Sequence, residues 1–161
     1  MPTPIELRLE VEDLYTAYAE ALDDGNIEAW PEFFVDDCLY LVIPNENYSR
    51  SLPLATIRCE SKGMLKDRVV AVRETMAFEP RTLRHLVSNF RVKANGDNGA
   101  APFDVLANYA VFESLIDEPA RVFNTGRYVD KLVRRDGVLK FQQKLCVFDS
   151  ALVPNSIVYP M

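Results

Sequence analysis

The stretch VFNTGRYVDKLVRRDGVLKFQQKLCVFD, residues 122–149, decides the fold of this chain. Apolar and polar residues alternate along two long runs, and the dipeptide Asp136-Gly137 separates them. Asp-Gly between two alternating runs is the strongest short-range signal for a two-residue β-hairpin turn. We therefore expect an antiparallel hairpin in which Arg135 pairs with Val138 and every further pair follows by counting outward.

Counting outward from the turn assigns the hairpin side chains to two faces. On one face Leu132 lies opposite Phe141 and Tyr128 opposite Leu145, and we expect this face to form core. The other face carries lysines near the turn, including Lys144, which we expect to be solvated. Farther from the turn this second face becomes apolar, with Phe123, Val129, Cys146 and Phe148. An outer face that becomes apolar needs something to cover it.

The segments before the hairpin alternate between helical and strand patterns. Apolar spacing predicts a helix over Ile5–Leu22, a short aromatic-rich helix after the N-cap Asn26, and a third helix after the N-cap Ser61 that ends before Pro80. The strands expected before the hairpin are Cys38–Ile43, Leu54–Cys59, Leu83–Lys93 and Phe103–Ser114. This order predicts one α+β domain over residues 1–161, a curved, mostly antiparallel sheet wrapped around three N-terminal helices, with residues 150–161 as an extended tail.

Strict alternation gives the long strands before the hairpin two apolar faces. In the first of these strands, Leu83 and Val87 lie on one face, whereas Leu86 and Phe90 lie on the other. A sheet with two apolar faces is buried on both. Since three helices close only the concave face, we expect a protein partner on the opposite one. The candidate interface residues are Phe123, Val129, Cys146 and Phe148, with Arg127 as a polar anchor.

Composition excludes several classes of partner and location. The formal net charge of -6 argues against a nucleic acid or an anionic membrane as the main partner. The N-terminal residues do not resemble a secretion signal, and no run of apolar residues approaches the length of a membrane span. The three cysteines, Cys38, Cys59 and Cys146, are an odd number at wide spacings, which suits free thiols in a reducing cytoplasm.

His85 is the only histidine in the chain. The chain alone therefore lacks the ligands of a Rieske cluster, of a two-histidine, one-carboxylate iron site and of a three-histidine zinc site. Alternation places His85 on the same face as Leu83 and Val87, where it could serve as an acid or base in an enclosed cavity. The alternative is a histidine that hydrogen-bonds within the sheet or at a partner surface.

Four motifs in order resemble the small (beta) subunits of Rieske-type aromatic-ring-hydroxylating oxygenases, which have the NTF2-like, cystatin-like cone fold. They are WPEFF with DDCLY at residues 30–40, SKGMLKDR at 61–68, RHLVSN at 84–89 and FNTGRYVDKL at 123–132. The sequences of these motifs are most similar to those of the small subunits of oxygenases for aromatic acids such as salicylate, anthranilate or terephthalate. One departure is Gln143-Lys144, where the last strand of such subunits often carries paired arginines.

The resemblance implies a non-catalytic structural subunit that scaffolds large subunits in aromatic compound catabolism. The Rieske [2Fe-2S] cluster and the mononuclear iron then belong to the large subunit, and this chain carries no cofactor of its own. The assembly implied is an α3β3 hexamer with beta-beta contacts. Two alternatives stay open: a free-standing dehydratase or isomerase that uses His85 as acid or base, and a small-ligand-binding module without chemistry.

Overall fold

A computed structural model describes residues 4–75, 80–95, 102–153 and 157–161. Its elements in chain order are helix α1 (Pro4–Asp23), the 3-10 helix η1 (Ile27–Phe33), strand β1 (Phe34–Pro44), the short helix α2 (Asn45–Ser49), strand β2 (Ile57–Cys59), helix α3 (Lys62–Val70), the π-helical turn η2 (Ala71–Thr75), and strands β3 (Arg81–Ala94), β4 (Phe103–Leu115), β5 (Arg121–Arg135) and β6 (Val138–Phe148).

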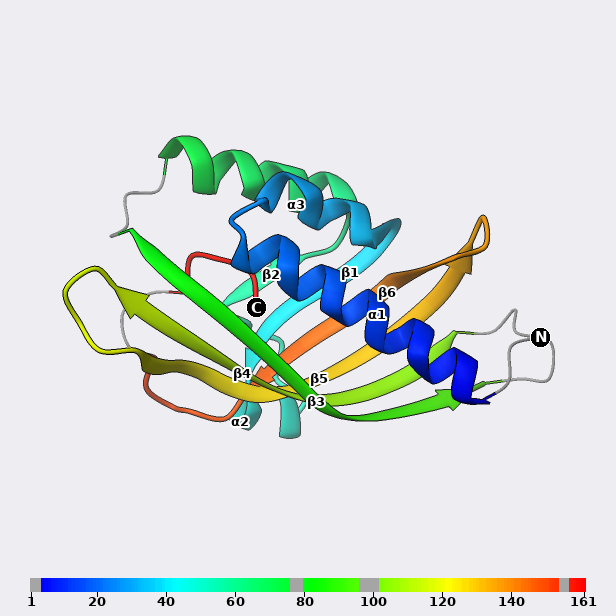
Figure 1. Ribbon diagram of the computed structural model, residues 1–161. Helices are drawn as coiled ribbons and strands as arrows, with labels where there is room; N and C mark the ends of the chain where they lie inside the picture. The colour runs from blue at the N-terminus through cyan, green and yellow to red at the C-terminus, as the bar shows by residue number, and fades with distance from the viewer. Residues whose placement is uncertain (1–3, 76–79, 96–101, 154–156) are drawn as a thin grey trace.

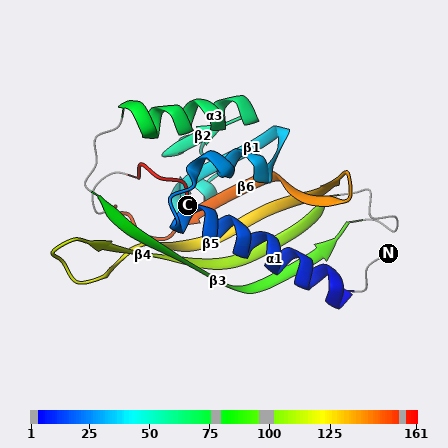
Figure 2. The same cartoon turned by 45° about the horizontal axis from the view of Figure 1, so that its top comes forward.

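The strands form one curved sheet in the order β2-β1-β6-β5-β4-β3 (Figure 1). The pair β1–β6 is parallel, and the other four pairs are antiparallel. Helices α1 and α3 and the helix η1 lie on the concave side, as Figure 2 shows. The predicted α+β cone with a mostly antiparallel sheet around three helices is confirmed, although the second of these helices is a 3-10 helix.

Local sequence explains where several elements begin and end. Gly25 follows α1 with φ of 71°, the left-handed conformation that glycine adopts without strain. The Ser61 hydroxyl accepts a hydrogen bond from the Met64 backbone N–H and caps α3, as expected. Asn26 occupies the N-cap position of η1, as predicted, but its side chain makes no capping hydrogen bond.

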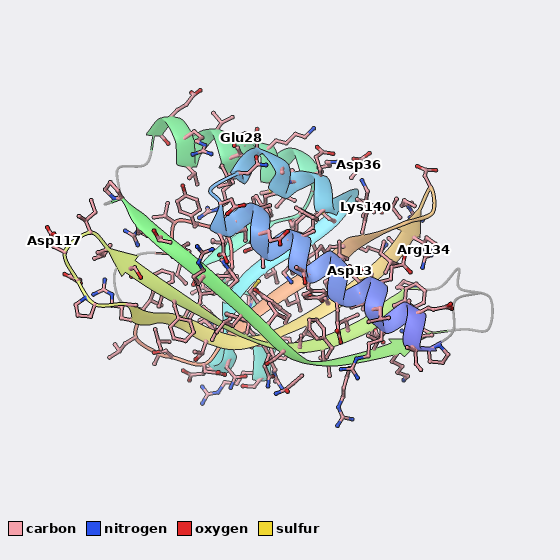
Figure 3. All side chains as sticks on the ribbon, viewed as in Figure 1. Asp13, Glu28, Asp36, Asp117, Arg134 and Lys140 are labelled. Carbon is pink, nitrogen blue, oxygen red and sulfur yellow. The ribbon has the colours of Figure 1, made fainter. Side chains whose placement is uncertain are left out.

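The hairpin turn forms as its sequence predicts. Asp136 has φ of 50° and Gly137 has φ of 83°, so both loop residues are left-handed, and Arg135 pairs with Val138. Near this turn, Arg134 makes an ion pair with Glu10 of α1 at 2.5 Å between Nη1 and Oε1. Arg134 lies at the hairpin end of the sheet in Figure 3. The ion pair therefore ties the end of the hairpin to the helix that crosses the sheet.

One-residue bulges interrupt the alternation in three strands. The register shifts make Asn89 the extra residue in β3, Phe123 in β5 and Gln142 in β6. An extra residue moves every later side chain of its strand to the opposite face. In β3 the bulge brings Phe90 to the concave side, where it packs against the core with Val92. The predicted second apolar face of this strand is therefore wrong for Phe90, whereas Leu86 remains on the outer face.

The bulge in β6 also overturns the predicted faces of the hairpin. Beyond Gln142, Tyr128 pairs with Cys146 instead of Leu145. Cys146 and Phe148 consequently point into the core, and so does Phe123, which is only 5% exposed. Lys144, expected in solvent, is fully buried. Of the five candidate interface residues, only Arg127 and Val129 lie on the outer face, where they pair with Val147 and Leu145.

Residues from the end of the chain complete the core. The Met161 N–H donates a hydrogen bond to the Tyr40 hydroxyl at 2.8 Å, and the Tyr18 hydroxyl donates to the Met161 carbonyl at 2.6 Å. The Met161 side chain is fully buried. Arg68 of α3 donates to the Val158 carbonyl at 2.9 Å. The described part of the tail therefore folds back between α3 and the sheet, where the red segment lies in Figure 1.

Candidate functional site

A buried ion pair occupies the interior of the cone. The Lys144 Nζ lies 2.9 Å from the Asp130 Oδ2, and both side chains are fully buried. The Tyr15 hydroxyl and the Leu145 backbone N–H also donate hydrogen bonds to Asp130. Burial raises the pKa of Asp130, and the Lys144 ammonium acts in the opposite direction. At the centre of the cone, Asp130 thus accepts hydrogen bonds from three donors.

Aromatic faces surround the ammonium group of this pair. The Lys144 Nζ lies 3.4 Å from the ring centroid of Tyr128 and 4.5 Å from that of Tyr15. Phe141 and Tyr18 also present their rings to it, at 4.5 and 4.8 Å. Contacts of this kind stabilise a desolvated cation by about 2 kcal/mol. Together with Met161, these side chains fill the interior of the cone.

His85 is held by the carboxylate of Asp23, the last residue of α1. The Asp23 Oδ1 lies 2.6 Å from the His85 Nδ1, and the His85 backbone N–H donates to the same carboxylate at 3.0 Å. The imidazole is fully buried, and its Nε2 has no hydrogen-bond partner among the described residues. In the sequence, the signal for a partner of His85 was the pair of acidic residues just before Gly25.

The Asp23–His85 pair borders a pocket of about 360 Å³ between α1 and β3. A carboxylate that orients an imidazole is the arrangement expected of a general base. Here, however, Nε2 is enclosed by protein, so a substrate could reach it only if α1 and β3 separated. The pair therefore orders the contact between α1 and β3 in this conformation.

The chain covers part of its own outer face. Leu41 and Ile43 of β1 and Leu145 and Val147 of β6 form a second buried cluster, against which Tyr48 of α2 packs. Helix α2 lies on the side of the sheet opposite α1 and α3 (Figure 1). The expectation that helices close only the concave face is therefore wrong for β1 and β6, because a short helix forms between the predicted strands Cys38–Ile43 and Leu54–Cys59.

The outer face of β3, β4 and β5 has no such cover in the described residues. Two neighbouring rows of paired residues cross it, and they line a groove of about 670 Å³ that we call the outer groove. The first row runs from β3 to β5 and is Arg91, Leu106 and Val129, whereas the second runs from β3 to β6 and is Lys93, Asp104, Lys131 and Gln143. The outer groove thus has an apolar floor with cations on both rows.

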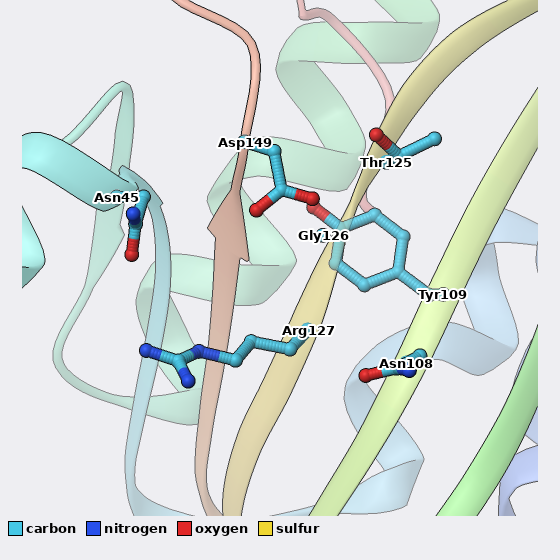
Figure 4. A pocket seen from close by; sticks show the side chains of 7 residues that line it. All are labelled: Asn45, Asn108, Tyr109, Thr125, Gly126, Arg127 and Asp149. Atoms are coloured by element: carbon cyan, nitrogen blue, oxygen red, sulfur yellow. The ribbon is translucent and has the colours of Figure 1, made fainter.

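A polar pocket of about 440 Å³ lies beside the outer groove, near α2 (Figure 4). Its lining residues are Asn45, Asn108, Tyr109, Thr125, Gly126, Arg127 and Asp149. The Arg127 guanidinium lies 5.7 Å from the ring centroid of Tyr48 and points toward Asn45 in Figure 4. Arg127 and Val129 thus lie on the uncovered face, and their place in an interface stays a prediction.

Comparison with solved structures first defines the fold class. A putative scytalone dehydratase from Novosphingobium aromaticivorans superposes with a TM-score of 0.69 at 19% identity, covering 98% of this chain and 96% of its own. At that identity the likeness shows the fold alone, an NTF2-like cone. The beta subunit of a putative aromatic-ring-hydroxylating dioxygenase from the same organism reaches a TM-score of 0.83 at 35% identity, covering 94% of this chain and 95% of its own.

Sequence comparison then gives the family. The model of the ring hydroxylating beta subunit matches residues 17–155. The anthranilate 1,2-dioxygenase small subunit of Burkholderia cepacia is 32% identical over 94% of this chain and 92% of its own length. A terephthalate 1,2-dioxygenase beta subunit of Comamonas sp. is 30% identical over 95% and 97%. This chain therefore belongs to the family of ring-hydroxylating dioxygenase beta subunits, which are structural subunits of multi-subunit oxygenases and imply a large-subunit partner.

No group of three or more His, Cys, Asp or Glu side chains in ranges 4–75, 80–95, 102–153 and 157–161 is arranged to hold a metal ion. No helix in those ranges is long and apolar enough to cross a membrane.

Proposed function

We propose that this chain is the scaffold of an oxygenase whose large subunit hydroxylates an aromatic acid, and that the complex is a cytoplasmic α3β3 hexamer with beta-beta contacts. The Rieske cluster and the mononuclear iron would both be held by the large subunit. The names of the similar small subunits, which belong to anthranilate and terephthalate dioxygenases, support an aromatic carboxylate as substrate.

The filled cone is the observation that carries the scaffold role. Lys144, Asp130 and Met161 are fully buried where a cone-fold enzyme or a ligand-binding module would keep a cavity. A substrate would have to displace a paired cation and carboxylate from an apolar interior, which costs several kcal/mol. The described geometry thus favours the structural role over both alternatives, free-standing catalysis and ligand binding.

Co-expression with the large subunit tests this proposal. We expect the purified complex to have the mass of three large and three small chains in light scattering, with all iron in the large subunit. We expect this chain alone to leave the aromatic acid unchanged. A stable complex of another stoichiometry would refute the hexamer, and hydroxylation by this chain alone would refute the scaffold role.

The Asp23–His85 pair gives the catalytic alternative its own test. His85→Asn keeps a side-chain donor for Asp23 but removes the acid-base group. We expect turnover per assembled complex to change less than twofold, whereas loss of a general acid or base costs about 10²–10⁴ in rate. A loss of that size in an intact complex would mean that this chain takes part in the chemistry.

A further inference from the structure

We propose that the outer groove is the surface on which the large subunit docks, through an acidic segment that places an apolar side chain over Leu106 and Val129. This inference rests on the proposed function and adds to it the surface and the chemistry of the contact. It also moves the interface away from the buried residues Phe123, Cys146 and Phe148.

Unpaired cations are the first argument. In the part of the chain that the structure describes, Arg91, Lys93 and Lys131 make no ion pair, although many other exposed cations do, as Arg58 does with Glu60. Asp104 lies between Lys93 and Lys131 in its row and accepts a hydrogen bond from Asn95, so one carboxylate faces three cations. A local excess of positive charge in a chain of net charge -6 is complementary to an anionic partner.

The apolar floor is the second argument. Leu106 is 45% exposed, and it pairs with the half-buried Val129 on one side and with Arg91 on the other. On the same face of β3, Leu86 is 59% exposed. Exposed apolar side chains bordered by charged ones are typical of the centre and the rim of a protein interface. The occupant should therefore combine an apolar residue with flanking carboxylates.

Charge also argues against a two-fold contact of the outer groove with a second copy of this chain. A two-fold contact of the outer groove with itself would place Arg91, Lys93 and Lys131 of one copy against the same cations of the other. Like charges opposed in this way cost several kcal/mol. An acidic segment of the large subunit avoids that cost, and it lets the small subunit join a hetero-oligomer without pairing through this face.

Charge reversal tests the inference in the co-expressed complex. The variant Arg91→Glu/Lys131→Glu changes two exposed residues whose side chains leave the core untouched. We expect it to bind the large subunit at least about tenfold more weakly than the wild type. The control Lys66→Glu/Arg135→Glu makes the same change of net charge at exposed positions on α3 and the hairpin end, and it should bind as the wild type does.

Salt dependence and cross-linking identify the occupant. Wild-type affinity should fall as the salt concentration rises, and that dependence should weaken in the reversal variant. A carbodiimide joins lysines only to carboxylates in direct contact, so Lys93 and Lys131 should link to an acidic peptide of the large subunit. Links to a second copy of this chain, or no links, would overturn the inference. So would equal binding by the reversal variant, whereas failure of the wild type to bind any large subunit would instead refute the proposed function.

Discussion

Replacing Lys144 by methionine removes the cation from the centre of the cone and leaves the shape of the side chain nearly unchanged. Asp130 then remains fully buried with two hydrogen-bond donors, the Tyr15 hydroxyl and the Leu145 N–H, but without a counter-ion. Removing one member of a buried pair costs about 3–5 kcal/mol in unfolding free energy. For a domain of this size, that loss lowers the melting temperature by about 10 °C.

The double variant Lys144→Met/Asp130→Asn measures the interaction energy between the two side chains, as distinct from the contribution of each side chain alone. The asparagine amide oxygen can still accept from Tyr15, and no buried charge remains. We expect the double variant to recover at least about 2 kcal/mol relative to the sum of the two single losses, because contacting charges are strongly coupled. Tyr128→Phe is the matched control. It keeps the ring under Lys144 and removes a hydroxyl that has no partner among the described residues, so stability should stay the same or rise slightly.

Urea unfolding of each variant measures these differences. Trp30 is the only tryptophan and is fully buried, so its fluorescence reports the loss of the core directly. Wild-type stability in Lys144→Met would refute the reasoning, because it would mean that Asp130 takes up a proton at little cost. Strictly additive single and double losses would show that the two groups do not interact.

Two further predictions use the same folded chain. Gly126→Ala should destabilise the β5–β6 pairing by more than about 2 kcal/mol in the same urea assay, because a Cβ at this position would lie 2.1 Å from the Val147 carbonyl oxygen; an unchanged midpoint would contradict the close approach. The cysteine thiols should not react with Ellman's reagent at neutral pH until the chain unfolds, because burial raises the pKa of Cys38 to about 11 and that of Cys146 to about 12. Rapid labelling of the native chain would show that the core opens.

Local signals in the sequence predicted the parts of the fold that local chemistry decides. Asp136-Gly137 fixes the hairpin turn because both residues tolerate left-handed backbone, and Gly25 ends α1 for the same reason. The helical spacing from Leu7 to Leu22 marks the buried face of α1, which also includes Tyr15. None of these features needs a partner that is distant in sequence.

The candidate site was harder to predict because bulges and buried charges depend on distant contacts. Nothing beside Gln142 distinguishes it as an extra residue, so counting outward from the turn fails beyond it. Lys144 was assigned to solvent because lysine is rarely buried without a partner, and its partner Asp130 lies on the neighbouring strand. Asn89, with φ of 58°, was the one bulge residue whose type carries a signal, since asparagine adopts this conformation more readily than most residues.

Each bulge fixes which face of the sheet every later residue of its strand points to. Deleting Gln142 would leave the remaining residues of β6 unchanged. It would nevertheless turn Leu145 and Val147 toward α1 and α3 on the concave side, and Lys144 and Cys146 toward α2 on the outer side. A second one-residue change later in the strand would restore only the residues beyond it. Members of this family should therefore differ in the length of β6 only by changes that cancel in pairs.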